Sequence, residues 1–282
     1  MTPRDLALTG VPRSGTTLCC RLVGLAEDCV SLFEPMEVAA LPRDRAGALG
    51  EGAAFYRDTR ASLRADGTAW SQQVAGQVPD NPFASQRDAA GQRRREAERG
   101  RIRVDKPLGP SFVLAIKHNA AFTALLPELA GYFDTVAIVR NPLAVLSSWH
   151  SVDLPVSRGR LPAGERLDPL LAARLDAEQD LIARQLLLLD WLFDRYQRFL
   201  PRGRVLAYEE VVASGGTLLA DAFGLRLQVQ DLHERNASHL YSARTSELLA
   251  QRLQADAGAW RSRYDDADVE RLLARMQAGA VA

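Results

Sequence analysis

The residues most able to do chemistry stand in one glycine-containing stretch near the start of the chain. Residues 10–17 read Gly-Val-Pro-Arg-Ser-Gly-Thr-Thr, with an apolar run before them and helically spaced apolar residues after them. A strand, a short loop and a helix start, in this order, present backbone N–H groups without partners at the positive end of a helix dipole. The hydroxyls of Ser14, Thr16 and Thr17 and the guanidinium of Arg13 add further donors. The stretch therefore predicts a binding site for a phosphate-like anion.

The same stretch has the glycine spacing of the nucleotide-triphosphate P-loop, G-x-x-x-x-G-K-[ST], at Gly10 and Gly15. Thr16 stands where that motif has its lysine, so the side chain that would reach the β- and γ-phosphates is missing. This departure argues against an enzyme that splits ATP or GTP, which usually also needs an aspartate at a strand end for Mg²⁺. A turn that binds nothing remains an alternative for this loop.

A second anion-binding pattern lies further along the chain. Residues 135–139 form the clearest strand pattern, a continuous apolar run typical of a strand buried on both faces of a parallel sheet. Arg140 follows directly, and Pro142 suits the first turn of a helix that carries Ser148. The arginine and the serine can bind one anion from two sides, the arginine through its planar, always charged fork. Because ligands of α/β sheets lie beyond such strand ends, we expect both patterns at one edge of the sheet.

Together, the two patterns resemble the nucleotide-binding elements of sulfotransferases that use 3'-phosphoadenosine-5'-phosphosulfate (PAPS) as donor. In that family the first loop binds the 5'-phosphosulfate, and an arginine eight positions before a serine, matched by Arg140 and Ser148, binds the 3'-phosphate. Tyr208 resembles the tyrosine after the last strand, and Trp260 resembles a late tryptophan near the nucleotide. The resemblance thus implies PAPS as co-substrate, without a metal. The implied nucleotide-binding residues are Pro12, Arg13, Ser14, Gly15, Thr16, Thr17, Arg140, Ser148, Tyr208 and Trp260.

The resemblance also implies a set of catalytic residues. Glu34, followed by proline, matches a glutamate that acts as catalytic base in carbohydrate and tyrosylprotein sulfotransferases, and Lys106 matches a lysine near the transferring group. Arg13 stands where many family members place a lysine in the first loop, which gives Lys106 more weight. Arg13 and Lys106 would stabilise developing negative charge, while Glu34 would remove the acceptor proton. His118 or His150 could be the base instead, because several branches of the family use a histidine.

Alternating strand and helix patterns predict an α/β fold, a three-layer sandwich with a mostly parallel central sheet and a P-loop-like phosphosulfate loop. Residues 1–282 are expected to form one domain, with a helical insertion at about 40–100 and a helical C-terminal part at about 215–282. The expected strands are 5–9, 30–33, 101–106, 135–139 and 204–208. The expected helices are 17–27, 45–66, 84–98, 119–130, 142–150 and 170–200, with a long polar loop at 152–169.

Composition limits the classes of partner. The 35 basic and 35 acidic residues cancel, so nothing indicates nucleic acid as a partner. The three cysteines, Cys19, Cys20 and Cys29, favour reduced thiols and the cytoplasm, and no second cluster of Cys or His suits a metal. No apolar run of about 18 residues predicts a membrane span, and the first residues lack the build of a signal peptide. We therefore expect a cytoplasmic protein; the sequence leaves its oligomeric state open.

The function implied by the resemblance is in-line transfer of a sulfuryl group from PAPS to an acceptor hydroxyl, with Glu34 as general base. Residues 33–38 most resemble carbohydrate-sulfating members, which puts a sugar hydroxyl first, a secondary-metabolite hydroxyl or phenol next and a protein tyrosine last. The acceptor pocket is expected in residues 36–100 and 152–170. A P-loop nucleotide kinase or hydrolase and a non-catalytic nucleotide-binding module are the alternatives.

Overall fold

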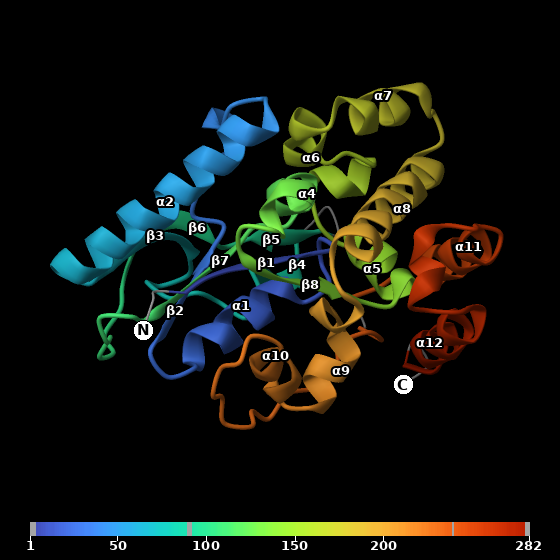
Figure 1. Ribbon diagram of the computed structural model, residues 1–282. Helices are drawn as coiled ribbons and strands as arrows, with labels where there is room; N and C mark the ends of the chain where they lie inside the picture. The colour runs from blue at the N-terminus through green and yellow to red at the C-terminus, as the bar shows by residue number, and fades with distance from the viewer. Residues whose placement is uncertain (1–3, 89–91, 239, 280–282) are drawn as a thin grey trace.

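The computed structural model describes residues 4–88, 92–238 and 240–279 (Figure 1). Its centre is a five-stranded sheet in the order β2-β7-β1-β8-β9, and each neighbouring pair in this sheet runs parallel. The strands are β1 (Asp5–Gly10), β2 (Cys29–Phe33), β7 (Val113–Lys117), β8 (Asp134–Val139) and β9 (Val205–Ala207). The predicted α/β fold with a mostly parallel central sheet is therefore confirmed.

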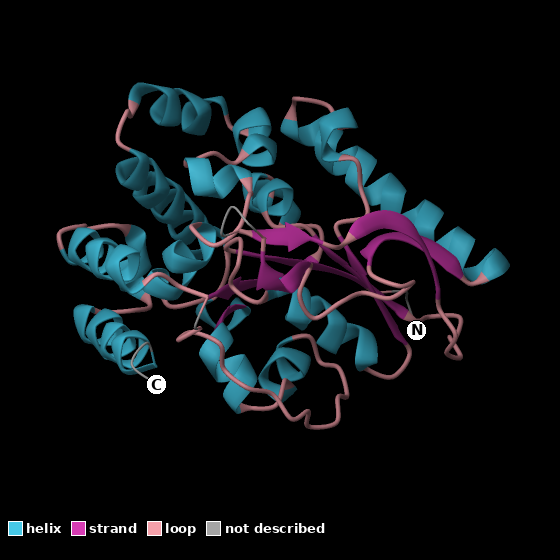
Figure 2. Ribbon diagram, turned by 180° about the vertical axis from the view of Figure 1, so that it is seen from behind, coloured by secondary structure: helices cyan, strands magenta, loops and turns pink. Residues whose placement is uncertain are grey.

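Helices cover both faces of the sheet, as Figures 1 and 2 show. On one face, Leu6 and Leu8 of β1 belong to an apolar cluster with α1 (Thr16–Leu25), α9 (Tyr208–Ala213) and α10 (Thr217–Ala222). On the other face, Ala7 belongs to a larger cluster. That cluster includes residues of α2 (Arg45–Asp66), α3 (Ala120–Ala124), α4 (Leu126–Leu129), α5 (Pro142–Trp149) and α8 (Leu181–Phe199). Three layers form because successive residues of each central strand are apolar on both faces.

The insertion between β2 and β7 differs from the prediction. Its first helix, predicted at 45–66, is confirmed as α2, but the helix predicted at 84–98 is wrong. Two antiparallel ribbons replace it. They pair β3 (Thr68–Gln73) with β6 (Glu98–Arg103) and β4 (Phe83–Arg87) with β5 (Arg93–Arg95). The polar, arginine-rich segment has little apolar periodicity of its own, so pairing with a neighbouring strand decides its conformation.

Three further boundaries move. The helix predicted at 119–130 divides into α3 and α4, and the one predicted at 170–200 divides into α7 (Pro169–Ala177) and α8. The loop predicted at 152–169 contains α6 (Pro162–Leu167). The C-terminal part contains α10, α11 (Ala243–Gln254) and α12 (Asp266–Gly279). None of the helices in the described residues has the length and apolar character needed to cross a membrane.

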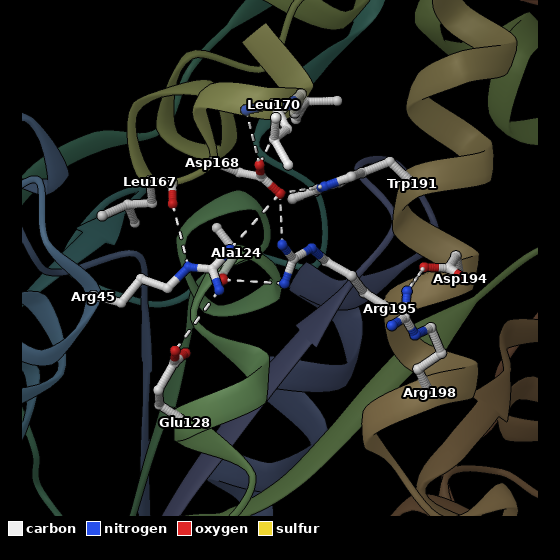
Figure 3. Close-up of polar contacts among 11 residues, drawn as sticks. Arg45, Ala124, Glu128, Leu167, Asp168, Leu170, Trp191, Asp194, Arg195 and Arg198 are labelled. Atoms are coloured by element: carbon white, nitrogen blue, oxygen red, sulfur yellow. Dashed lines mark hydrogen bonds and ion pairs between the residues drawn. The ribbon is translucent and has the colours of Figure 1, made fainter. Parts of the chain in front are cut away.

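A buried polar network around Asp168 joins the helices of the larger layer (Figure 3). One carboxylate oxygen accepts hydrogen bonds from the amides of Leu170 and Leu171 at the start of α7. The other accepts from Trp191 Nε1 at 2.9 Å and from Arg195 Nη2 at 2.5 Å, both on α8. The side chains of Asp168 and Arg195 are each only 9% exposed. Both oxygens of this carboxylate are used within the fold, which fixes α7 against α8.

Candidate active site

The predicted anion loop joins β1 to α1, and two glycines allow its close packing. A Cβ at Gly10 would lie 2.3 Å from the Ile138 carbonyl oxygen, and one at Gly15 would lie 2.4 Å from the ring of Tyr208. Gly15 has a φ of +85° and is the N-cap of α1, and among the residues that the structure describes no side chain caps this helix. An uncapped helix start is a position where backbone N–H groups can bind an anion.

Two of the predicted loop ligands use their polar atoms inside the protein. The Pro12 carbonyl oxygen accepts a hydrogen bond from Trp149 Nε1 at 2.8 Å, and Ser14 Oγ donates to the Ile138 carbonyl oxygen at 2.9 Å. These bonds fix the loop to α5 and β8. The Ser14 hydroxyl is therefore a support of the loop rather than a free donor. Thr16 and Thr17 lie in the first turn of α1, as predicted.

Arg13 points from the loop toward α5 and the ribbon of β4 and β5. Its Nε donates to Ser148 Oγ at 3.1 Å, its Nη1 donates to Asn81 Oδ1 at 3.3 Å, and its guanidinium lies 4.6 Å from the centre of the Phe83 ring. Its backbone φ is +73°, a value that is strained for any residue other than glycine. Burial, with a further contribution from nearby arginines, lowers the pKa of Arg13 to about 10. A guanidinium in such surroundings gains stability from a bound anion.

Arg140 lies at the carboxyl end of β8 and reaches under the loop. Its Nη1 donates to the Arg13 carbonyl oxygen at 2.9 Å, and its Nε donates to Asn236 Oδ1 at 2.6 Å. Burial would raise the pKa of Tyr241, but the nearby charges of Arg140 and Arg13 lower it below its usual value. The structure thus brings Arg13, Arg140 and Ser148 together. Asn236 and Tyr241, which the sequence analysis missed, belong to the same group, and no local motif marks either of them.

Glu34 lies at the carboxyl end of β2, two strands away from the loop. Its Oε1 accepts a hydrogen bond from Lys117 Nζ at 2.6 Å, and its backbone N–H donates to the Lys117 carbonyl oxygen at 2.8 Å. The Lys117 side chain is 3% exposed and that of Glu34 is 29% exposed. Burial opposes ionisation of Glu34, but the charge and the hydrogen bond of Lys117 outweigh it and hold the pKa of the carboxyl below its usual value. Glu34 also has a positive φ, of 43°.

The structure corrects the predicted catalytic lysine. Lys106 Nζ donates to the carbonyl oxygens of Gly24 and Ala26 at 2.7 and 2.9 Å, at the far end of α1. That end lies about 13 Å along the helix from the anion loop, at 1.5 Å per residue. The prediction is wrong because β6 pairs with β3 in a ribbon, so the residues after it do not reach the sheet edge. Lys117, the last residue of β7, is the lysine at that edge. The apolar run before Lys117 was a usable signal for this strand.

Both alternative bases are engaged within the protein. His118 is buried and its Nε2 accepts a hydrogen bond from the Met36 N–H at 3.2 Å, while burial lowers the pKa of His118 to about 4. His150 Nε2 lies 3.0 Å from Gln185 Oε1. The amide nitrogen of Gln185 donates to the Val156 carbonyl oxygen, so Oε1 is the acceptor and His150 Nε2 carries the proton.

Of the two late aromatic residues, one lies at the site. Tyr208 packs beneath Gly15, and the Arg140 guanidinium stacks 4.7 Å from the centre of its ring. Trp260 is fully buried, donates from Nε1 to Asp256 Oδ2 at 2.8 Å and is covered by the guanidinium of Arg261. Both its ring and its N–H are used in packing the C-terminal helices, and its nucleotide contact stays a prediction.

Two other features of the sequence can be placed. In the described residues, no group of three or more His, Cys, Asp or Glu side chains is arranged to bind a metal ion. Cys19, Cys20 and Cys29 are buried free thiols in α1 and β2, and burial raises the pKa of Cys20 and of Cys29 to about 12. These thiols act as small packing groups.

No protein-family model and no curated protein sequence matches the chain. Among solved structures, a sulfotransferase from Alicyclobacillus acidocaldarius is 14% identical, with 93% of this chain and 100% of that one covered and a TM-score of 0.39. The sulfotransferase domain from the curacin biosynthetic pathway is 15% identical over 98% of each chain, with a TM-score of 0.40. Sulfotransferase STF1 from Mycobacterium tuberculosis H37Rv is 14% identical, covering 91% of this chain and 78% of that one, with a TM-score of 0.39. Likeness at this level does not by itself assign an activity.

Proposed function

We propose that the protein is a sulfotransferase that moves a sulfuryl group from PAPS to an acceptor hydroxyl. One observation carries the proposal: a single edge of the parallel sheet holds two arginines with a serine, which can bind an anion, and a carboxylate–lysine pair. Arg13, Arg140 and Ser148 gather at the ends of β1 and β8, and Glu34 and Lys117 pair at the ends of β2 and β7. Three strand spacings, about 14 Å, separate β2 from β8, which leaves room for a donor at the arginines and an acceptor beside Glu34.

The donors at this edge fit PAPS, which supplies an activated sulfuryl group when it is bound. Arg140, Ser148 and Arg13 would bind the 3'-phosphate, since Arg13 is hydrogen-bonded to Ser148 through its Nε and to Arg140 through its carbonyl oxygen. The uncapped start of α1, with Thr16 and Thr17, would bind the 5'-phosphosulfate. A nucleotide kinase fits less well, because the P-loop lysine position is a threonine whose short side chain lies in the helix start.

The geometry around Glu34 supports its proposed action on the acceptor. Its Oε1 is bonded to Lys117, and in the described part of the chain no hydrogen bond to Oε2 is found. An ionised carboxylate with one open oxygen can take the proton of an acceptor hydroxyl, which is worth about 10²–10⁴-fold in rate. The nearly buried ammonium of Lys117 keeps Glu34 ionised and adds fixed positive charge where negative charge develops.

The ribbon of β3 and β6 would form the acceptor side of the site. It is attached beside Glu34, because the Phe33 N–H donates to Ser71 Oγ at 3.0 Å and Arg99 Nε donates to the Pro35 carbonyl oxygen at 2.8 Å. For the acceptor we retain a sugar hydroxyl, on the likeness of residues 33–38 to carbohydrate-sulfating enzymes. A library of hydroxyl compounds assayed with labelled donor tests this choice.

Nucleotide binding tests the proposed function most directly. We expect adenosine 3',5'-bisphosphate to raise the Tm of the protein by several degrees, because it binds only the folded state, and ATP with Mg²⁺ to raise it less. Arg140→Ala should weaken bisphosphate binding by about 2 kcal/mol through loss of charge-assisted hydrogen bonds. Arg198→Ala is the matched control, since Arg198 is 66% exposed on α8. Equal or greater stabilisation by ATP with Mg²⁺ would contradict the proposal.

A further inference from the structure

The guanidinium of Arg13 is held by three uncharged groups from two other segments of the chain. Its Nε donates to Ser148 Oγ on α5 at 3.1 Å, and its Nη1 donates to Asn81 Oδ1 at 3.3 Å. The ring of Phe83, the first residue of β4, lies with its centre 4.6 Å from Arg13 Cζ. Ser148 is part of the predicted anion site, whereas no pattern in the sequence marks Asn81 or Phe83.

These contacts leave much of the Arg13 guanidinium open. A guanidinium has five N–H groups, and the bonds to Ser148 and Asn81 use two of them. In the residues that the structure describes, no hydrogen bond from Nη2 is found and no carboxylate pairs with Arg13. Contact with an aromatic face uses no N–H group. The direction of Arg13 is therefore fixed, while its charge and the N–H groups of Nη2 remain for an anion.

The ring of Phe83 is itself fixed by the ribbon of β4 and β5. Phe83 is only 5% exposed. The carbonyl oxygen of Pro82, before it, accepts a hydrogen bond from the Glu96 N–H at 2.9 Å. The carbonyl oxygen of Ala84, after it, accepts from Arg93 Nε at 2.8 Å. The backbone on both sides of the ring is thus bonded within the ribbon, so the ring is a fixed support for the guanidinium that lies on it.

The same ribbon is attached to the end of α5, the helix that carries the other hydrogen-bond acceptor of Arg13. The Arg93 N–H donates to the Ser151 carbonyl oxygen at 3.1 Å, three residues after Ser148. The guanidinium of Arg93 also lies 6.0 Å from the centre of the Phe83 ring. The ribbon and α5 are therefore fixed to each other on either side of Arg13.

We propose that Asn81 and Phe83 are positioning residues, which hold Arg13 in the orientation in which it binds an anionic group of the donor. This inference rests on the proposed function, since it concerns the same nucleotide site. Ordering a long side chain costs conformational entropy, and contacts that order Arg13 beforehand remove that cost from the binding step. A neutral amide oxygen and an aromatic face suit this role because neither cancels the charge that attracts the anion. A carboxylate at position 81 would also hold Arg13, but it would compete with the anion.

Two substitutions test the inference by titration calorimetry with adenosine 3',5'-bisphosphate. Phe83→Leu should weaken binding about fivefold, because the cation–π contact that orders Arg13 is lost, whereas Phe83→Tyr should retain the native affinity. Asn81→Asp should weaken binding about tenfold without lowering the Tm, because the new carboxylate pairs with Arg13. Phe199→Leu is the control and should leave binding unchanged, since it removes a ring that lies 5.6 Å from the Arg198 guanidinium on α8.

A double-mutant cycle separates positioning of Arg13 from support of the fold. In the Arg13→Ala background, Phe83→Leu should have no further effect on bisphosphate affinity, because the side chain that the ring positions is gone. A ring that only supports the ribbon would weaken binding equally in both backgrounds.

The outcomes distinguish this inference from the proposed function. Native affinity in either Phe83→Leu or Asn81→Asp, or an equal loss from Phe83→Leu in the two backgrounds, would overturn the inference and leave the proposed function standing. If Phe83→Leu is unstable, the affinity of Asn81→Asp decides alone. If the native protein binds ATP with Mg²⁺ as tightly as the bisphosphate, both proposals are wrong.

Discussion

Two carboxylates of this protein, each paired with a cation, differ in how many hydrogen bonds they accept from the rest of the protein. Asp168, among the helices of the larger layer, accepts from Trp191 and Arg195 through one oxygen and from two backbone amides through the other (Figure 3). Glu34, at the edge of the sheet, accepts from Lys117 through one oxygen at 2.6 Å. The side chain of Asp168 is 9% exposed and that of Glu34 is 29% exposed.

The difference separates a structural pair from the pair that we propose is reactive. A carboxylate with both oxygens bonded inside the protein contributes to stability only while all its partners remain. A carboxylate with one open oxygen and a buried cation behind it stays ionised and can still accept a proton. Glu34 and Arg13 also both have positive φ values. Strained backbone of this kind is typical of functional sites, so it agrees with a functional role for the Glu34 pair.

The largest expected effect is on turnover in Glu34→Gln. The amide keeps the size of the side chain but cannot take the acceptor proton, so single-turnover transfer from labelled donor should fall by about 10²–10⁴-fold. Binding of adenosine 3',5'-bisphosphate, measured by calorimetry, should remain. Unchanged turnover would remove Glu34 as the base.

Asp168→Asn should show the opposite behaviour. An amide nitrogen facing Trp191 Nε1 and Arg195 Nη2 replaces an acceptor with a donor and leaves the buried Arg195 charge without its partner. We expect a loss of about 3 kcal/mol in the free energy of unfolding, measured by urea denaturation, with bisphosphate affinity retained. If Asp168→Asn kept its stability but lost nucleotide binding, the Asp168–Arg195 pair would have a functional role like the one proposed for Glu34 and Lys117.

The smallest expected effect comes from replacing Lys117, and the same replacement at Lys106 is its control. Lys117→Met should lower turnover by roughly a hundredfold, because it removes the charge behind Glu34. Lys106→Met makes the same change at the far end of α1. It should leave turnover unchanged. A loss of turnover in Lys106→Met alone would restore the lysine assignment that the sequence favoured.

Local patterns were enough to predict much of the site. The loop at residues 10–17 and the strand that ends at Arg140 were found from the sequence, because glycine spacing and apolar runs depend only on neighbouring residues. The position of Glu34 at the end of β2 followed in the same way. The roles of these residues in binding and catalysis remain predictions for the experiments above.

The misplaced residues share a physical cause. Lys106 follows a real strand, but that strand pairs with β3 outside the central sheet, and an isolated segment carries no information about its partner. The arginine-rich segment at 93–95 becomes a strand for the same reason. Trp260 has the expected motif, yet its ring is fully buried among the C-terminal helices.

By itself, the sequence determined which strands and helices alternate, where an anion could bind, and that a triphosphate lysine was missing at Thr16. Only the tertiary structure decided which lysine stands behind Glu34 and which side chain meets Arg140. Strand order brings Lys117 to Glu34, and the fold brings Asn236 to Arg140. Such contacts join residues far apart in the chain, and their free energy comes from packing that no local pattern records.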